Sequence, residues 1–114
     1  MLFLEDLKKK LESGYTFRHY LDFTIYGCSV QSVNETSSCF SIVTFEDKDD
    51  NVSFDFDLEK KVFLSYGCDI EERYNSILNA LKEAKETNSL LKVCFRIRRE
   101  KPYIIHLEVI NQVK

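Results

Sequence analysis

The sequence predicts a mainly β fold with two helices: a five-stranded Greek-key barrel of order β-β-β-α-β-β, preceded by a short N-terminal helix. Three observations predict it. Residues of alternating polarity recur through 16–65, an amphipathic helical pattern occupies 69–87, and alternation returns from residue 91. The 114 residues have room for one core, and a hydrophobic content of 44% is enough to fill it. We therefore expect a single domain over 1–114.

The N-terminal helix is predicted within residues 1–14. Its apolar residues recur at helical spacing: Leu4, Leu7 and Leu11. Gly14 stands where a helix commonly ends in a left-handed conformation. This helix either plugs the open end of the barrel or docks onto another chain, and the sequence leaves both alternatives open.

Strands one to three are expected within 15–65. Gly27 interrupts the first alternation, as glycine does where a strand bulges or bends sharply, so the first strand is predicted to be long and coiled. The third strand alternates most regularly, with Phe54 and Phe56 inward. Residues 62–64 are apolar and either extend this strand or form a short extra one.

The helix between strands three and four is expected over 69–88. Asp69 and Glu72 have the spacing of a capping box, and Asn88 is a plausible end. Strands four and five are expected over 89–112. Alternation in the last strand predicts three inward residues: Ile105, Leu107 and Val109.

Composition limits the classes of function. A net charge of −3 and a pI near 5.4 count against a dedicated nucleic-acid binder, which is usually basic. The acidic start, Glu5 and Asp6, is unlike a signal peptide, and no apolar run approaches the ~18 residues of a membrane helix. These features predict a soluble, cytoplasmic protein without membrane contact. Four widely spaced cysteines predict reduced, partly buried thiols rather than a zinc site or disulfides.

Enzymatic motifs are missing from the sequence. None of the three glycines lies in a phosphate-binding loop, no G-x-S-x-G elbow occurs, and His19 and His106 have no recognisable nucleophile partner. The acidic turn near Asp49 fails as a calcium loop, because Val52 and Leu58 stand where glycine and glutamate are required. We therefore predict no enzyme activity, no cofactor and no metal.

Residues 20–112 resemble the OB-fold superfamily. The resemblance rests on Phe23-Thr24-Ile25-Tyr26-Gly27, then Val43-Thr44-Phe45-Glu46-Asp47, then Asn51-Val52-Ser53-Phe54, a succession similar to that of anticodon-binding-like barrels. It implies a binding module, with the ligand across strands two and three and between the first–second and fourth–fifth loops. The superfamily has no fixed functional residues, so it assigns none here.

Charge is divided along the chain. Residues 46–59 contain seven acids and one base, whereas 92–101 contain five bases and one acid. The basic segment supports a single-stranded nucleic-acid binder or a subunit of a nucleic-acid-processing complex, with cations on phosphates and tyrosines stacking on bases. Its candidate residues are Tyr26, Lys92, Arg96, Arg98, Arg99, Lys101 and Tyr103. Arg96 and Arg98 alternatively form a solvated face paired with Glu108.

The acidic segment supports a second hypothesis, a protein–protein interaction module that acts as an adaptor or inhibitor and presents its acids to a basic partner. Its candidate residues are Glu46, Asp47, Asp49, Asp50, Asp55 and Asp57. The superfamily resemblance places the nucleic-acid hypothesis first. The sequence does not decide the oligomeric state.

Overall fold

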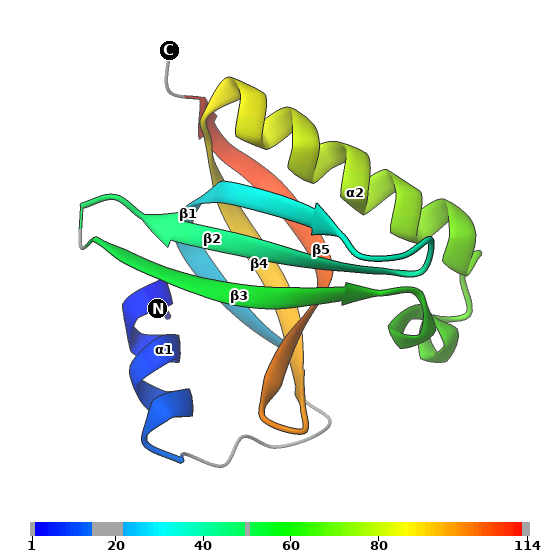
Figure 1. The fold of residues 1–114 in the computed structure, drawn as a ribbon, viewed down its shortest axis with the longest axis horizontal. Coiled ribbons are helices and arrows are strands. Elements are labelled where there is room, and N and C mark those ends of the chain that lie inside the picture. Colours follow the sequence, from blue (N-terminus) through cyan, green and yellow to red (C-terminus); the bar gives the residue numbers. More distant parts are fainter. Residues whose placement is uncertain (1, 15–21, 50, 113–114) are drawn as a thin grey trace.

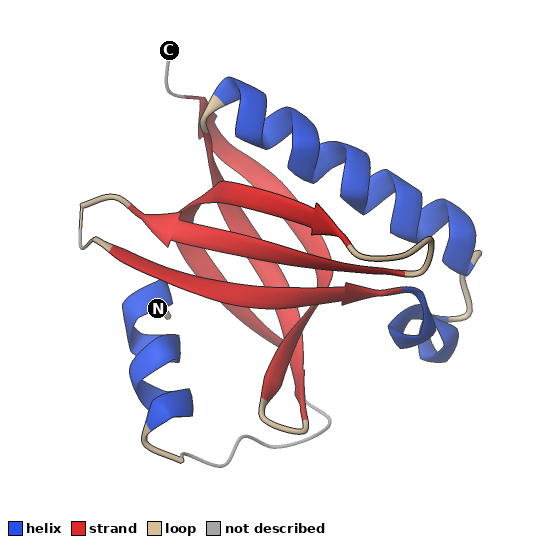
Figure 2. Ribbon diagram, in the orientation of Figure 1, coloured by secondary structure: helices blue, strands red, loops and turns tan. Residues whose placement is uncertain are grey.

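The computed structural model describes residues 2–14, 22–49 and 51–112; His19 and segment 15–21 of the predicted first strand lie outside them. The elements are α1 (Leu4–Glu12), β1 (Asp22–Glu35), β2 (Phe40–Asp47), β3 (Val52–Glu59), the 3₁₀ helix η1 (Lys60–Tyr66), α2 (Ile70–Thr87), β4 (Ser89–Arg98) and β5 (Lys101–Gln112). The strands close into a barrel of order β1-β2-β3-β5-β4 (Figures 1 and 2). The predicted five strands, with one helix before them and one between the third and fourth, are confirmed.

β1 pairs with two different strands because it bends. Its first half pairs with β4 and its second half with β2, and the register shifts between Tyr26 and Cys28. Gly27 lies at this shift with φ +75, while a Cβ added there would meet no atom within 4 Å. The position therefore requires glycine for its left-handed backbone rather than for space. The predicted interruption of the strand is confirmed.

Residues 62–64 were predicted to be strand, and this was wrong. They lie in η1, where Val62 and Phe63 are both buried although they are adjacent in sequence. A strand would place adjacent side chains on opposite faces, whereas a tight helical turn brings both toward the core. Gly67 then takes a left-handed conformation at φ 65 and ends η1. The described residues thus contain three helical elements, and β3 ends at Glu59.

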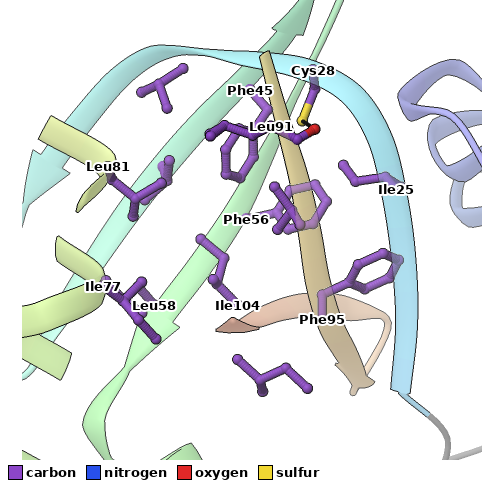
Figure 3. Close-up of a cluster of buried hydrophobic side chains, with 14 of the residues drawn as sticks. Ile25, Cys28, Phe45, Phe56, Leu58, Ile77, Leu81, Leu91, Phe95 and Ile104 are labelled. Atoms are coloured by element: carbon purple, nitrogen blue, oxygen red, sulfur yellow. Dashed lines mark hydrogen bonds between the residues drawn. The ribbon is translucent and has the colours of Figure 1, made fainter. Parts of the chain in front are cut away.

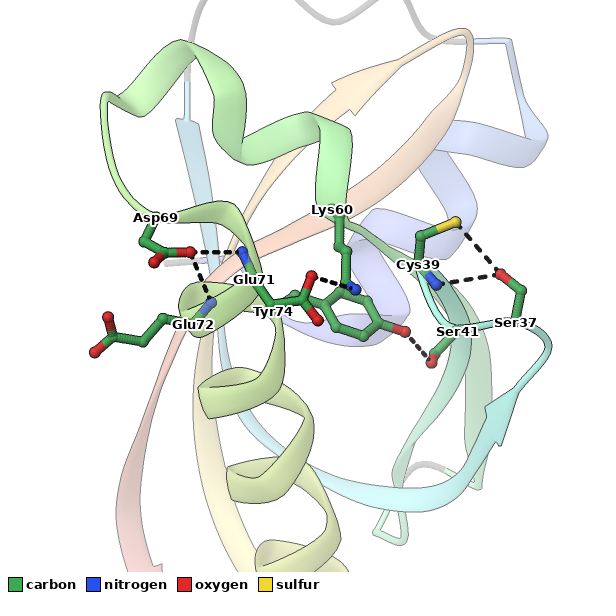
Figure 4. Close-up of polar contacts among 8 residues, drawn as sticks. All are labelled: Ser37, Cys39, Ser41, Lys60, Asp69, Glu71, Glu72 and Tyr74. Atoms are coloured by element: carbon green, nitrogen blue, oxygen red, sulfur yellow. Dashed lines mark hydrogen bonds and ion pairs between the residues drawn. The ribbon is translucent and has the colours of Figure 1, made fainter.

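α2 follows the sequence prediction closely. The Asp69 carboxylate accepts hydrogen bonds from the amides of Glu71 and Glu72 (Figure 4). Asn88 ends the helix with φ 53. Its buried residues are Tyr74, Ile77, Leu78, Leu81 and Ala84. The Tyr74 hydroxyl lies 2.7 Å from the Ser41 hydroxyl inside the protein, so the one polar group on this apolar face is hydrogen-bonded.

β5 departs from the predicted alternation. Cys94 pairs with His106 and Phe95 with Ile104, so Ile105 is an extra residue in a bulge. Ile104 consequently enters the core, which the prediction had assigned to Ile105, Leu107 and Val109. Ile105 is also buried, Leu107 is half-buried and Val109 is 52% exposed. The bulge changes the phase of the side chains between the first part of the strand, where Pro102 and Ile104 are buried, and the part after Ile105, where Leu107 is half-buried.

The core is rich in phenylalanine. The Phe56 ring lies 5.0 Å from the ring of Phe45 and 5.3 Å from that of Phe95, in edge-to-face contact with both (Figure 3). Such pairs stabilise by about 0.5–1.5 kcal/mol beyond the area they bury. From α1, Leu4 and Leu7 are fully buried in the same core, so this helix packs on the barrel. In Figure 1, α1 and α2 lie on opposite sides of the strands.

The four cysteines are free thiols, as predicted. Burial raises the pKa of the Cys28 thiol to about 12, whereas Cys39 and Cys68 are exposed and Cys94 is half-buried. Within the residues described, no helix combines the length and apolar character needed to cross a membrane.

Candidate functional site

A groove of about 660 Å³ lies between η1 and the end of β4. It is lined by Lys61, Val62, Leu64, Ser65, Arg96, Arg98 and Arg99, and we call it the basic groove. Alternation on β4 builds one wall, since Phe95 and Ile97 point into the core and leave Arg96 and Arg98 outside. The other wall of the groove is formed by η1, where the Leu64 side chain is 65% exposed.

Arg96 is held in place by its neighbours. Its guanidinium pairs with the Asp22 carboxylate at 3.1 Å and lies 5.0 Å from the centroid of the Tyr66 ring. The Tyr66 hydroxyl donates a 3.4 Å hydrogen bond to the same carboxylate. Burial, followed by the charge of Asp22, raises the pKa of Tyr66, which keeps the phenol protonated as a donor. The arrangement fixes the Tyr66 ring, which is 40% exposed at the edge of the groove.

The other cations of the groove are free to meet a ligand. Lys61, Arg98 and Arg99 are exposed, and none makes an ion pair with a described residue. Arg99 and Glu100 form the two-residue turn between β4 and β5, with φ values of 52 and 65. Both are left-handed, as a type I′ turn requires, although asparagine and glycine suit these positions far better. The turn therefore holds Arg99 at the groove in a strained conformation.

Tyr26 and Lys92 lie apart from the groove. They face each other across β1 and β4, with the Lys92 ammonium 5.7 Å from the Tyr26 ring centroid. Glu108 lies 3.8 Å from Lys92, so the carboxylate predicted to pair with Arg96 and Arg98 instead pairs with this lysine.

Lys101 and Tyr103 lie on β5, next to the closure of the barrel. Tyr103 is half-buried and pairs in parallel register with Asp57 of β3. Burial, then Asp57 and Glu59, raise the pKa of Tyr103. Of the predicted nucleic-acid set, Arg96, Arg98 and Arg99 line the groove. Tyr103 and Lys101 lie directly opposite Arg96 and Arg98 on β5, whereas Tyr26 and Lys92 lie further along β1 and β4.

The predicted acidic set does not form one exposed patch. Asp57 is buried, and desolvation raises the pKa of its carboxyl, while Lys101 acts in the opposite direction. Asp57 pairs with Tyr103 of β5 in parallel register, and only a small part of it is exposed to a partner. Asp55 is exposed and accepts a 2.6 Å hydrogen bond from Thr44. Asp50 lies outside the described residues.

The remaining acids gather at the β2–β3 turn. Glu46, Asp47 and Asp49 line a pocket of about 430 Å³ that also includes the half-exposed ring of Phe3. Lys48 enters the same pocket, 3.8 Å from Glu46 and within 3.0 Å of the Asn88 side-chain oxygen. The acids are therefore partly compensated by a cation from their own turn.

Sequence reasoning missed Lys61, Leu64 and Tyr66. Residues 62–64 were assigned to a strand, so their neighbours were not considered as part of a site. The available signal was Gly67, three residues after the apolar run 62–64, since a glycine there can end a helical turn. In the described part of the chain, no three His, Cys, Asp or Glu residues gather to hold a metal ion. In comparisons with known proteins, no family model and no curated protein matches the chain.

Proposed function

We propose that this protein is a non-enzymatic binding module of the OB type that holds single-stranded nucleic acid in its basic groove. Support for the OB assignment comes from the closed five-stranded order and from α2, which lies between the third and fourth strands as the resemblance implies. The free thiols favour a reducing, cytoplasmic location.

The observation that carries the proposal is the unpaired charge of Lys61, Arg98 and Arg99. In a chain of net charge −3, most cations would be expected to find carboxylates, yet these gather on one groove without any among the described residues. Like charges held close together repel unless an anion joins them. A phosphate backbone supplies such anions in series, and its release of counterions drives binding.

The burial of Asp57 reduces one objection to this function, although Asp55 of the same strand is exposed. An exposed carboxylate on β3 would repel phosphates, but this one is buried beside Tyr103. The proposed path also differs from the one the resemblance implies. In both paths the nucleic acid contacts the β4–β5 turn. In the proposed one it lies over η1 instead of across the acidic strands β2 and β3.

The test is a salt titration of binding to fluorescein-labelled oligothymidylate, followed by anisotropy. Three phosphate contacts predict a slope of log affinity against log salt of roughly −2, since single strands give about 0.7 per contact. The double charge reversal Arg98→Glu with Arg99→Glu should weaken binding at low salt by at least about tenfold and make the slope less steep. Lys85→Glu, a single charge reversal on α2, should leave the affinity and the slope unchanged. Absence of binding at low salt, or equal effects of both variants, would overturn the proposal.

A second candidate function is docking of a basic protein segment at the β2–β3 turn. It is favoured by the pocket that combines Glu46, Asp47 and Asp49 with the ring of Phe3, because carboxylates beside an aromatic face suit an arginine or lysine side chain. Under this alternative, oligonucleotide binding is absent, and a basic peptide binds in a manner abolished by Asp47→Lys and untouched by Arg98→Glu.

A further inference from the structure

A smaller hollow of about 300 Å³ adjoins the basic groove at Tyr66. It is lined by Phe63, Tyr66, Cys68, Arg73, Ile105 and His106. The Tyr66 ring that lines this hollow is the same ring over which Arg96 of the groove packs, at 5.0 Å. The two depressions are therefore linked by the contact between Arg96 and Tyr66, and η1 contributes residues to both.

The walls of the hollow suit a flat heteroaromatic ring. Phe63 and Ile105 are buried and make its inner side apolar, while the ring of Tyr66 offers an aromatic face. Polar groups stand at its border: Arg73 uses one guanidinium nitrogen on the Ile105 carbonyl at 3.3 Å, and its other donors remain. The His106 imidazole also lines the hollow, 3.4 Å from Glu108. Apolar walls with a few N–H donors are typical of pockets that take a planar ring with carbonyl acceptors.

We propose that this hollow is a base pocket, in which a nucleobase stacks on Tyr66 while the neighbouring phosphates lie along the basic groove. The inference rests on the proposed function and adds to it the position at which a base is bound. Asp22 and Arg96 hold the Tyr66 ring before any ligand arrives, so stacking requires little ordering of the side chain. Arg96 is thus a positioning residue for the ring.

The proposal moves stacking away from the strand tyrosine predicted from sequence. Tyr26 lies four residues along β1 from Asp22, roughly 13 Å at the usual strand rise. It also carries a cation over its ring, Lys92, which makes it a close chemical match for Tyr66. Tyr26 therefore serves as the control position.

The first experiment compares two strands of equal length on the full chain: oligothymidylate and an abasic strand with the same phosphates. Tyr66→Leu should weaken oligothymidylate binding roughly 5- to 150-fold, the range expected for one lost base–aromatic stack, and change abasic binding by less than about twofold. Tyr66→Phe keeps the ring and should retain most of the affinity. Tyr26→Leu should change neither.

A second experiment needs no variant. Cys68 lines the hollow and is exposed, while Cys39 is exposed in the β1–β2 loop. Saturating oligothymidylate should slow alkylation of Cys68 several-fold and leave Cys39 unchanged, as followed by mass spectrometry. The abasic strand should protect Cys68 much less.

The outcomes separate the inference from the function on which it rests. If the unaltered protein binds neither strand, the proposed function itself fails. If it binds both strands equally, and neither Tyr66→Leu nor Cys68 alkylation distinguishes them, the groove binds phosphates and the base pocket is wrong. If Tyr26→Leu alone removes the dependence on bases, stacking takes place on the strand face and the inference is overturned.

Discussion

The basic groove and the acidic strands β2 and β3 hold their charges in different ways. On the acidic side, Asp55 accepts a hydrogen bond from Thr44, the Asp47 carboxylate accepts one from the amide of Asp49, and Lys48 approaches Glu46. In the groove, only Arg96 has a carboxylate partner among the described residues. A surface whose charges are already compensated gains little from a ligand, whereas uncompensated charges gain more because an anion relieves their repulsion.

The difference originates in the local backbone. Asp55 lies on a regular strand opposite Thr44, while Glu46, Asp47 and Asp49 lie where β2 enters its turn to β3, beside the turn amide of Asp49 and the Lys48 ammonium. Of the groove cations, Lys61 stands on the 3₁₀ helix η1 and Arg99 on the left-handed hairpin turn, while Arg96 and Arg98 lie at the end of β4. Irregular segments on a rigid barrel are common places for binding sites. This comparison supports the groove as the proposed binding surface, and the following variants test it from the largest expected effect to the smallest.

Phe56→Ala should damage both regions at once. Phe56 lies on β3 beneath the acidic strands, and its ring contacts Phe95 of β4 behind the groove. Removing a fully buried aromatic ring should lower the free energy of unfolding by about 3–5 kcal/mol, measured by urea denaturation. Phe54→Ala, at a half-buried position of the same strand, should cost less. If Phe56→Ala lowers the free energy of unfolding by less than about 1 kcal/mol, the Phe56 ring does not stabilise the two regions together.

The β4–β5 turn should show stability and binding changing in opposite directions. Arg99→Asn combined with Glu100→Gly places favourable residues at two left-handed positions and should raise the free energy of unfolding by about 1 kcal/mol. The same variant should weaken oligothymidylate binding, because one groove cation is lost. Glu100→Gly alone is the matched control, since it relieves part of the strain and keeps Arg99. If the double variant gains stability and keeps full affinity, Arg99 has no part in the groove.

Asp57→Asn should stabilise the protein at neutral pH by a modest amount. Burial raises the pKa of Asp57 above its ordinary value of 3.8, so the folded chain binds this proton more tightly than the unfolded chain does. Stability from this group is therefore complete below the ordinary pKa and is lost as pH rises through the raised one. The variant should have a higher urea midpoint than the unaltered protein near pH 7 and an equal one near pH 3.

The matched control for this measurement is Asp55→Asn, which removes the same charge at an exposed position on the same strand. It should change the midpoint less than Asp57→Asn does. A lower midpoint for Asp57→Asn near pH 7 would mean that attraction to Lys101 outweighs the burial of the carboxylate.

Much of the fold could be predicted from the sequence because its signals are local. Asp69 caps α2 through amides two and three residues away, and Gly27 marks the bend of β1. Alternation on β4 correctly placed Phe95 inside and Arg96 outside. Each of these signals depends on neighbours along the chain, so a single sequence is sufficient to identify it.

The candidate site was predicted only in part. Arg96, Arg98 and Arg99 were identified because they share one strand and its turn, but their opposite wall, η1, was not. Two adjacent apolar residues, Val62 and Phe63, have no periodicity that separates a strand from a tight helical turn.

The sequence by itself determined the strands, the capped helix and the division of charge between the chain's middle and its C-terminal third, because each follows from periodicity or composition over a short window. The tertiary structure decided which charged side chains are exposed to a ligand. It buried Asp57 against Tyr103, shifted β5 by a bulge, and brought the turn of Lys61 and Tyr66 beside Arg96 and Arg99. These contacts join segments far apart in the chain, and they form only when the barrel closes, since closure alone sets which strands and turns become neighbours.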